Sequence, residues 1–490
     1  MVESTQNKLL RLKPPRTRIT HDVETDGVIE KRELPFVVGI LADVKGNREH
    51  AAGDESLATR AMIDIGRDNF NEIMAGIAPR LACSALASGL QGEAALVFRS
   101  IGDFEPRHII DALPWLSRLR DDDPALNQAL AAIMHSASFR KMEATWRGLH
   151  YLVFNTETGS MLRLRLLDAR KDELLHDLQQ AATVEHSALY RNIRDSDVPC
   201  SLLIGDHEID ASSADMALLH GMAEVAAALH APFVAQASPG LLGLDSFTEL
   251  QHGIDAGTLR SWQAFRENDN ARWITLAVPR ALLRLPYGMP ADASGLWGNP
   301  AWLLAGRITR AFALHAWPAA IHGLEGGGLV EPLPYGGHAA SAGGSALPYP
   351  ADAVIDSQLD KELTRLGFAT LRQDEHSGKA YLNIPAMLPH LLAASRFAHH
   401  LSAMMRARSG GVMSRAEVHA FLDSWLAGHV LLDDHATQEN MASHPLRAAA
   451  VNVIDEPDAP GSWRATLFLK PQFQLDDLGI SIRLAMRLPK

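Results

Sequence analysis

Cysteine is nearly absent from this sequence. Its 490 residues include only Cys83 and Cys200, too few for a disulfide framework or a cysteine-rich zinc site, and we interpret them as incidental thiols of a reducing compartment. Long apolar runs are also absent, so no membrane span is expected. The basic N-terminus, MVESTQNKLLRLKPPRTR, has no apolar core, which argues against a secretory signal. These absences predict a cytoplasmic protein without direct membrane insertion.

The chain also lacks an excess of positive charge. The chain has 46 Lys and Arg residues against 58 Asp and Glu residues, a formal net charge of −12. A general nucleic-acid binder needs a basic face, so this balance argues against that class. The composition, 47% hydrophobic and 21% charged, is ordinary for a globular protein. Single cores stop growing at ~250–300 residues, so two or three subdomains are expected.

The segment 139–167 predicts a nucleus on which other segments pack. Four large apolar residues recur at helical spacing and predict the core-facing side of a helix: Phe139, Met142, Trp146 and Leu149. The apolar run 151–154 then predicts a strand, and 155–159 predicts a turn. Residues 161–167 alternate leucine with arginine, which is typical of a half-buried strand.

Alternation of strands and helices predicts an α/β fold. Residues 36–41 form a continuous apolar run suited to a strand buried on both faces. Strand-like runs at 200–204 and 232–236 enclose a long Ala-rich helix, and this order predicts parallel strands.

Further strands are expected near both ends of the chain. Residues 17–23 and 28–34 predict a hairpin. Residues 450–454, 463–470 and 480–488 predict three late strands. The expected fold class is therefore α/β (α+β), with mixed sheets flanked by helices and a separate sheet built from N- and C-terminal strands.

No catalytic pattern emerges from the motifs. The glycine-rich segment 323–328 lacks the Lys-Ser or Lys-Thr that completes a phosphate-binding loop, and a tight structural loop is the better interpretation. The histidines, including His399 beside His400 and His315 with His322, form no HExxH pattern, so core or surface histidines are expected rather than metal ligands. We therefore predict no enzyme, no cofactor and no metal site.

Many separated segments resemble one known family. ITHDVETDGVIEKRELPFVVGILADVKG (19–46) is similar to the start of the small subunit of the type VI secretion contractile sheath, and IDIGRDNFNEIM and FEP continue that likeness. From about residue 133 the chain resembles the large sheath subunit instead. The segments are SFRKMEATWRGLHYLVFNTETG, LLIGDHEID, HAPFVAQASPGLLGLDSFTEL, VPRALLRLPYG, LWGNPAWLLAGRIT, GLEGGGLVEPLP, SRFAHHLSAMMR and FLKPQFQLDDLGISIRLAMRLP. The resemblance covers nearly the whole chain and implies a natural fusion of the two subunits.

The resemblance divides the chain at the acidic cap that precedes Pro124. It implies a small-subunit-like region at 1–123 and a large-subunit-like region at 124–490. The latter would comprise an α/β body at about 124–385 and C-terminal helices and strands at 386–490. Most of the long C-terminal helix of the small subunit, and the usual N-terminal segment of the large subunit, have no counterpart. In the family that segment is recognised by a cytoplasmic AAA+ unfoldase, so its absence argues against that partner.

The function implied by the resemblance is structural and not enzymatic. Sheath protomers self-associate into a helical polymer around an inner tube protein, on baseplate components, and contraction propels the tube and its effectors. The missing segments favour a second interpretation, a degenerate sheath-like protein that caps or regulates a normal sheath. A small-molecule α/β enzyme that uses the glycine-rich loop is a third.

Strand exchange suits a contracting polymer, because backbone hydrogen bonds tolerate rotation of the bodies that they connect. We therefore predict that strand 17–23 and the three late strands form an inter-protomer sheet; an ordinary intramolecular sheet is the alternative. The candidate residues are Thr17, Ile19, His21, Val23, Val451, Val453, Leu467, Leu469, Ile480, Ile482 and Leu484. The predicted structural core of the large-subunit-like region is Phe139, Met142, Trp146 and Leu149.

Overall fold

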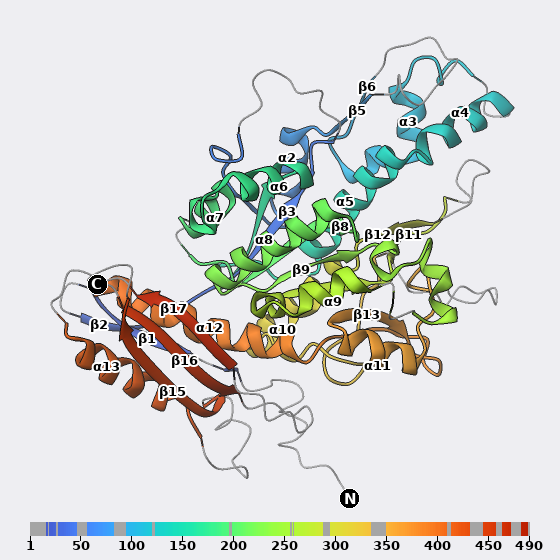
Figure 1. Ribbon diagram of the computed structural model, residues 1–490. Coiled ribbons are helices and arrows are strands. Elements are labelled where there is room, and N and C mark those ends of the chain that lie inside the picture. Colours follow the sequence, from blue (N-terminus) through green and yellow to red (C-terminus); the bar gives the residue numbers. More distant parts are fainter. Residues whose placement is uncertain are drawn as a thin grey trace, which may run out of the picture.

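Eight strands form one sheet through the middle of the protein (Figure 1). The computed structural model describes residues 16–17, 19–25, 28–46, 56–82, 95–119, 123–195, 198–254, 257, 259–287, 295–334, 349–408, 413–431, 444–456, 463–471 and 482–488. In spatial order the strands are β14 (Ala380–Asn383), β13 (Phe368–Gln373), β10 (Ile274–Val278), β9 (Phe233–Ala237), β8 (Leu202–Ile209), β3 (Phe36–Ala42), β7 (Leu162–Asp168) and β4 (Ile63–Ile65). The inner six are parallel, whereas β14 and β4 pair antiparallel at the two edges.

β3 occupies the interior of this sheet. Every residue of β3 is buried, as a strand covered on both faces requires, and the strand expected at 36–41 is confirmed. Val38 pairs with Leu164 of β7 on one side and with Leu202 of β8 on the other. A strand from the first 123 residues is therefore inserted between two strands from the remainder of the chain, and one sheet is built from both regions.

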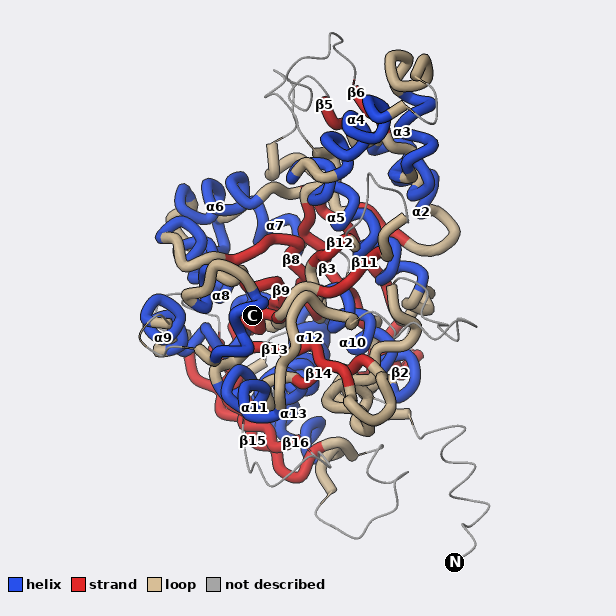
Figure 2. Tube along the Cα trace, turned by 90° about the vertical axis from the view of Figure 1, so that its right-hand side faces the viewer, coloured by secondary structure: helices blue, strands red, loops and turns tan. Residues whose placement is uncertain are grey.

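Helices cover both faces of the sheet. On one face lie α6 (Lys171–Gln180), α7 (Ala188–Arg194), α8 (Ser213–Leu229), α9 (Arg260–Arg266), α11 (Ser357–Arg365) and most of α12 (Met387–Ala407). On the other lie α2 (Phe70–Ile77), α3 (Pro106–Ala112), α4 (Pro124–Met134), α5 (Ala137–Phe154) and α10 (Ala301–His315). Figure 2 shows α6, α8 and α9 together on one side of the strands. This layering confirms the α/β fold class.

The segment 139–154 differs from the expectation at its end. α5 continues to Phe154, so the strand expected at 151–154 is wrong. Tyr151, Leu152 and Val153 are all buried, because α5 is enclosed on several sides there. A short apolar run cannot distinguish a buried strand from a buried helix by periodicity. The half-buried strand expected at 161–167 is confirmed as β7.

Gly148 permits the close packing of α5 on α10. A Cβ added at Gly148 would lie 2.3 Å from Cδ1 of Trp302, whose side chain is fully buried. We expect Gly148→Ala to destabilise the protein by about 1–2 kcal/mol, because overpacking costs about 1–3 kcal/mol and exceeds the gain in helix propensity of about 1 kcal/mol. Denaturant unfolding measures the change. Gly76→Ala in α2, where the added Cβ meets open space, is the control that should stabilise; equal effects of both substitutions would contradict this account.

The terminal strands lie at the opposite end of the molecule from α3 and α4 (Figure 1). β15 (Leu446–Asp455), β16 (Trp463–Pro471) and β17 (Ile482–Leu488) form an antiparallel sheet of their own, which confirms the separate C-terminal sheet. β1 (Thr20–Thr25) and β2 (Val28–Glu33) form the expected hairpin. Within the described residues the hairpin does not pair with the C-terminal sheet, and α12 contacts both. α13 (Arg415–Ala427) flanks β15.

Two further pairs of short strands complete the fold. β5 (Arg80–Ala82) pairs with β6 (Ala95–Val97), and β11 (Ala281–Arg284) pairs with β12 (Leu296–Gly298). α4 begins at Pro124, and Oδ1 of Asp123 accepts a hydrogen bond from the backbone N–H of Ala125 at 2.8 Å, the capping expected there. Among the described helices, none has the length and apolarity that a membrane crossing requires.

Candidate functional site: the terminal strands and the shared sheet

The candidate inter-protomer residues face the core of their own chain. Thr17, Ile19 and His21 are buried in a row, and Val23 is half-buried. The candidates in the C-terminal sheet that are buried are Val451, Val453, Leu467, Leu469, Ile482 and Leu484. Ile480 lies outside the described residues. Alternation of buried and exposed positions leaves a second face of this sheet toward solvent, so any exchange between protomers has to use strand edges or that outer face.

One edge of the C-terminal sheet is occupied by the body of the protein. Arg272 Nη2 donates to the carbonyl of Arg483 at 3.0 Å, and Nε2 of His230 lies 3.1 Å from the carbonyl of Ala485, so two carbonyls of β17 already have partners. The opposite edge differs. β15 is held at Leu446 by backbone hydrogen bonds with 429–431, but from Ala448 to Asp455 it pairs only with β16 in the described part of the chain. That stretch offers backbone groups to an added strand.

The hairpin has one docked strand and one exposed strand. Trp425 of α13 donates its indole N–H to the Thr20 carbonyl at 2.9 Å, and the Thr17 N–H donates to the carbonyl of His315 at the end of α10 at 2.8 Å. β2 instead faces solvent, with Val28 59% and Ile29 69% exposed. Exposed apolar side chains on an edge strand are unusual unless another surface covers them.

A buried arginine fixes the hairpin to the sheet. Arg396 of α12 is 4% exposed and donates from Nη1 to the Pro35 carbonyl at 2.9 Å, and from Nη2 to the Leu34 carbonyl. These carbonyls precede β3. Burial lowers the pKa of Arg396 to about 10, so the guanidinium is charged at neutral pH and is solvated by backbone oxygens in place of water. The position where β3 begins is therefore set by α12.

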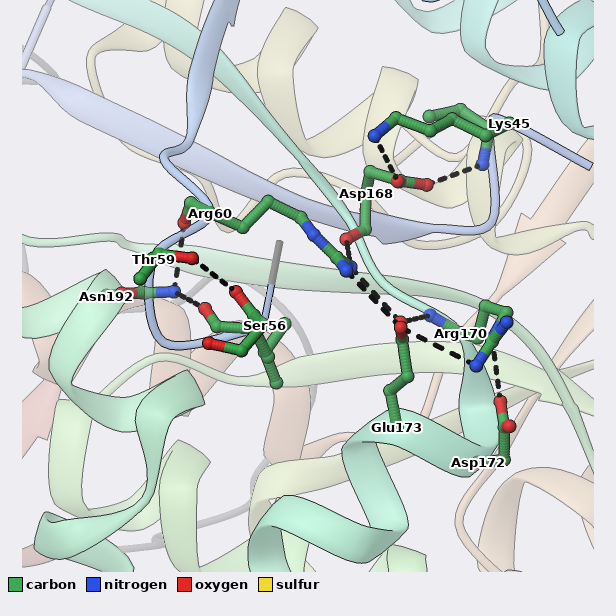
Figure 3. Close-up of polar contacts among 11 residues, drawn as sticks. Lys45, Ser56, Thr59, Arg60, Asp168, Arg170, Asp172, Glu173 and Asn192 are labelled. Carbon is green, nitrogen blue, oxygen red and sulfur yellow. Dashed lines mark hydrogen bonds and ion pairs between the residues drawn. The ribbon is translucent and has the colours of Figure 1, made fainter. Parts of the chain in front are cut away.

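A polar network ties the two sequence regions together beside the sheet (Figure 3). Arg60 lies between β3 and β4, and its Nη1 is 3.1 Å from Oε2 of Glu173 in α6. Asn192 of α7 donates to the carbonyl of Arg60 at 3.1 Å, and Lys45 lies 3.4 Å from Asp168 at the end of β7. Burial opposes ionisation of Glu173, but hydrogen bonds from Arg60 and Arg170 outweigh it and lower the pKa of Glu173.

A buried carboxylate on α5 was not identified from the sequence. Glu143 is fully buried; its Oε1 lies 2.7 Å from Nε of Arg147 and 2.7 Å from Nε of Arg284 in β11. Arg147 also donates to Tyr287 at 2.8 Å, and burial raises the pKa of Tyr287 to about 12. The i, i+4 spacing of Glu143 and Arg147 was the only signal in the sequence, and it is typical of surface pairs as well.

The crevice that an α/β enzyme would use contains paired charges. It lies outside the carboxyl ends of β3, β7 and β8, where the order of the strands reverses, and has a volume of about 460 Å³. Lys171 lies 2.5 Å from Asp215, and Lys141 lies 3.9 Å from Asp43. Each of these two lysines therefore already has a carboxylate beside it.

The glycine-rich segment 323–328 is a tight turn against β14. The N–H of Gly323 donates to the Leu382 carbonyl at 2.8 Å, and Gly328 donates to the Gly323 carbonyl at 2.9 Å. A Cβ at Gly327, where φ is +96°, would meet the Ala320 carbonyl at 2.0 Å. Backbone amides used in this way cannot hold a phosphate. The described residues contain no group of three or more His, Cys, Asp or Glu side chains placed to hold a metal ion.

The helix face predicted in α5 lies in the core. Phe139, Trp146 and Leu149 are fully buried and Met142 is 4% exposed. The Trp146 indole N–H donates to the Val44 carbonyl at 3.0 Å, another contact between residues before and after position 123.

Comparison with known proteins gives matches along most of the chain. Residues 9–145 match the family described as "Type VI secretion system, VipA, VC_A0107 or Hcp2". Residues 118–384 match "EvpB/VC_A0108, tail sheath N-terminal domain", and residues 377–488 match "EvpB/VC_A0108, tail sheath gpW/gp25-like domain".

Two curated proteins of Pseudomonas aeruginosa are similar to different parts of the chain. The type VI secretion system sheath protein TssC1 is 33% identical over 419 residues, which cover 75% of this chain and 84% of that protein. The type VI secretion system sheath protein TssB1 is 33% identical over 120 residues, which cover 24% of this chain and 68% of that protein.

Proposed function

Since this chain belongs to the sheath families of the type VI secretion system and joins a small-subunit-like to a large-subunit-like sequence, we propose that a single polypeptide serves as the complete protomer of a contractile sheath. Its role as a sheath subunit is structural. The observation that supports the proposal is the insertion of β3 between β7 and β8, because this joins the two regions within one rigid sheet.

The proposed division places the small-subunit-like region at 1–123 and the large-subunit-like region at 124–490. Two contacts support a permanent union of the regions: the Arg60–Glu173 pair and the Trp146–Val44 hydrogen bond. In two separate subunits such contacts would form by association. In one chain they form at an effective concentration set by the connection near Pro124, without loss of translational freedom.

Protomers would be connected through the hairpin and the C-terminal sheet. The open stretch of β15, Ala448–Asp455, and the exposed strand β2 offer the edges that strand exchange needs. The buried residues at Thr17–Val23, Val451, Val453, Leu467, Leu469, Ile482 and Leu484 would then hold each strand on its own protomer while backbone groups bind the neighbour.

Contraction requires interfaces with two stable arrangements and tethers that persist through the change. We place the protomers in the cytoplasm, around an inner tube and above a baseplate, with no catalytic step. The energy for propulsion would come from additional contact in the contracted state. No segment is assigned to an unfoldase, because the family's recognition segment before α5 has no counterpart in this chain.

The alternative role is a cap or regulator of a normal sheath. Adding the purified chain in trace amounts to assembling two-subunit sheaths distinguishes this role from that of a complete protomer. A complete protomer is expected to be incorporated along their length and to leave their length unchanged. Sheaths that become shorter as more chain is added, with the chain only at their ends, would overturn the proposal and identify a cap.

A further inference from the structure

Two histidines meet ring to ring beneath the N-terminal hairpin. Nδ1 of His21 on β1 and Nδ1 of His400 on α12 lie 2.9 Å apart, and the ring centroids are 5.0 Å apart. Trp425 of α13 stacks on His400 and donates to the Thr20 carbonyl. His21 is 3% exposed and His400 is 0% exposed. We call His21, His400 and Trp425 the latch, because they join β1 to both helices.

Only one proton fits between the Nδ1 atoms of His21 and His400. A hydrogen bond between two Nδ1 atoms requires one ring to carry a proton on Nδ1 and the other to carry none. Nε2 of His400 is buried without a hydrogen-bond partner among the described residues, so a proton added there would have no acceptor. If both rings were charged, both Nδ1 atoms would carry protons and their contact would be lost. A single added proton would keep the contact but place a charge on a buried ring, so the neutral pair is the form that fits best.

The groups that face His21 are mainly cationic. Arg32 lies opposite His21 in the hairpin, and Arg408 follows the end of α12. The charge of Asp22, which is exposed, acts in the opposite direction and raises the pKa of His21. Burial, and then the charge of Arg32, lower the pKa of His21 below its ordinary value.

The groups around His400 come from α12 and from the end of α13. Arg396 and His399 lie on α12 itself, and His429 follows α13. Burial, and then the charge of Arg396, hold the pKa of His400 well below 6.5. α12 itself contains no carboxylate, whereas α13 carries Glu417 and Asp423.

We propose that the latch is controlled by protons: the hairpin stays docked on α12 and α13 while His21 and His400 are neutral, and it is released when they take up protons. The device concerns the single chain and goes beyond its role in a polymer, so its test does not depend on assembly.

The direction of the pH dependence follows from the linkage between proton binding and docking of the hairpin. In a released hairpin both rings meet water and titrate near their ordinary pKa of about 6.5. Because the docked pKa is lower, the released state binds more protons, so docking is strongest above pH ~6.5 and weakens as the pH falls. For His400 alone, the docking equilibrium should fall about tenfold between pH 7.5 and pH 5.5.

Amide hydrogen exchange of β1 tests the proposal. Protection of Thr20–Thr25 is measured by mass spectrometry at pH 7.5 and pH 5.5, with intrinsic exchange rates corrected for pH. β3 (Phe36–Ala42) is the internal reference, because it reports unfolding or aggregation of the whole body. We expect the protection of β1 to fall at least about tenfold relative to β3.

Substitutions at His21 and His400 test whether these two residues cause the loss of β1 protection at pH 5.5. His400→Phe keeps an aromatic ring beside Trp425 and His21→Phe changes only the hairpin side, and each should reduce the relative loss of protection at pH 5.5. His220→Phe is the matched control: His220 lies on α8, packs edge-on against Phe265 at 5.0 Å, and should leave the loss unchanged. Equal behaviour of β1 and β3 in the wild type, or an undiminished loss in either latch variant that folds, would overturn the proposal.

Discussion

Replacing Ile29 with aspartate should raise the concentration at which the chain assembles at least about tenfold and leave its fold intact. Ile29 is 69% exposed on β2, so the isolated protomer loses little when it changes. At an interface the aspartate would have to lose water without a partner. A loss of about 2 kcal/mol or more per contact, typical of interface hot spots, raises the critical concentration at least about tenfold. Sedimentation of polymer against protein concentration measures it.

Val354→Asp is the matched control for this substitution. Val354 is 63% exposed but precedes α11 near β13, away from the terminal strands. It should sediment as the wild type does. Unfolding midpoints should be equal in all three proteins. Normal assembly of Ile29→Asp would exclude β2 from the contacts between protomers.

The second large effect is expected at Glu143. Glu143→Gln removes the charge that compensates Arg147 and Arg284, and Arg284 is only 7% exposed. Breaking a buried ion pair by removing one partner costs about 3–5 kcal/mol, because the remaining charge stays buried without compensation. We expect a loss of that size in the free energy of unfolding at pH 7, measured by denaturant titration.

Glu157→Gln provides the comparison for Glu143→Gln. Glu157 is an exposed carboxylate just after α5, and its removal should change stability by less than about 0.5 kcal/mol. If the two substitutions had equal effects, the cluster around Glu143 would not contribute the stability assigned to it.

Sequence patterns were sufficient where burial follows a simple period. The apolar run 36–41 predicted a strand buried on both faces, observed as Phe36–Ala42, and the alternation at 161–167 predicted a half-buried strand, observed as Leu162–Asp168. The C-terminal strands were found for the same reason. The run that ends α5 was misassigned, because Tyr151, Leu152 and Val153 are all buried and carry no period.

Contacts between distant residues could not be predicted from the sequence. The insertion of β3 between β7 and β8 depends on pairings across more than 120 residues, which no local pattern encodes. His21 and His400 are 379 positions apart, so the sequence indicated a core or surface histidine at His400 and a strand residue at His21 without pairing them. Glu143 likewise gains its buried partner from β11.

Electron microscopy of this chain, purified without any other sheath protein, tests whether one polypeptide forms a sheath by itself. A complete protomer has both sheath regions in one body, so we expect long hollow tubes of uniform width that form from this chain alone. Only monomers or short rings, under conditions where the chain is folded, would contradict it.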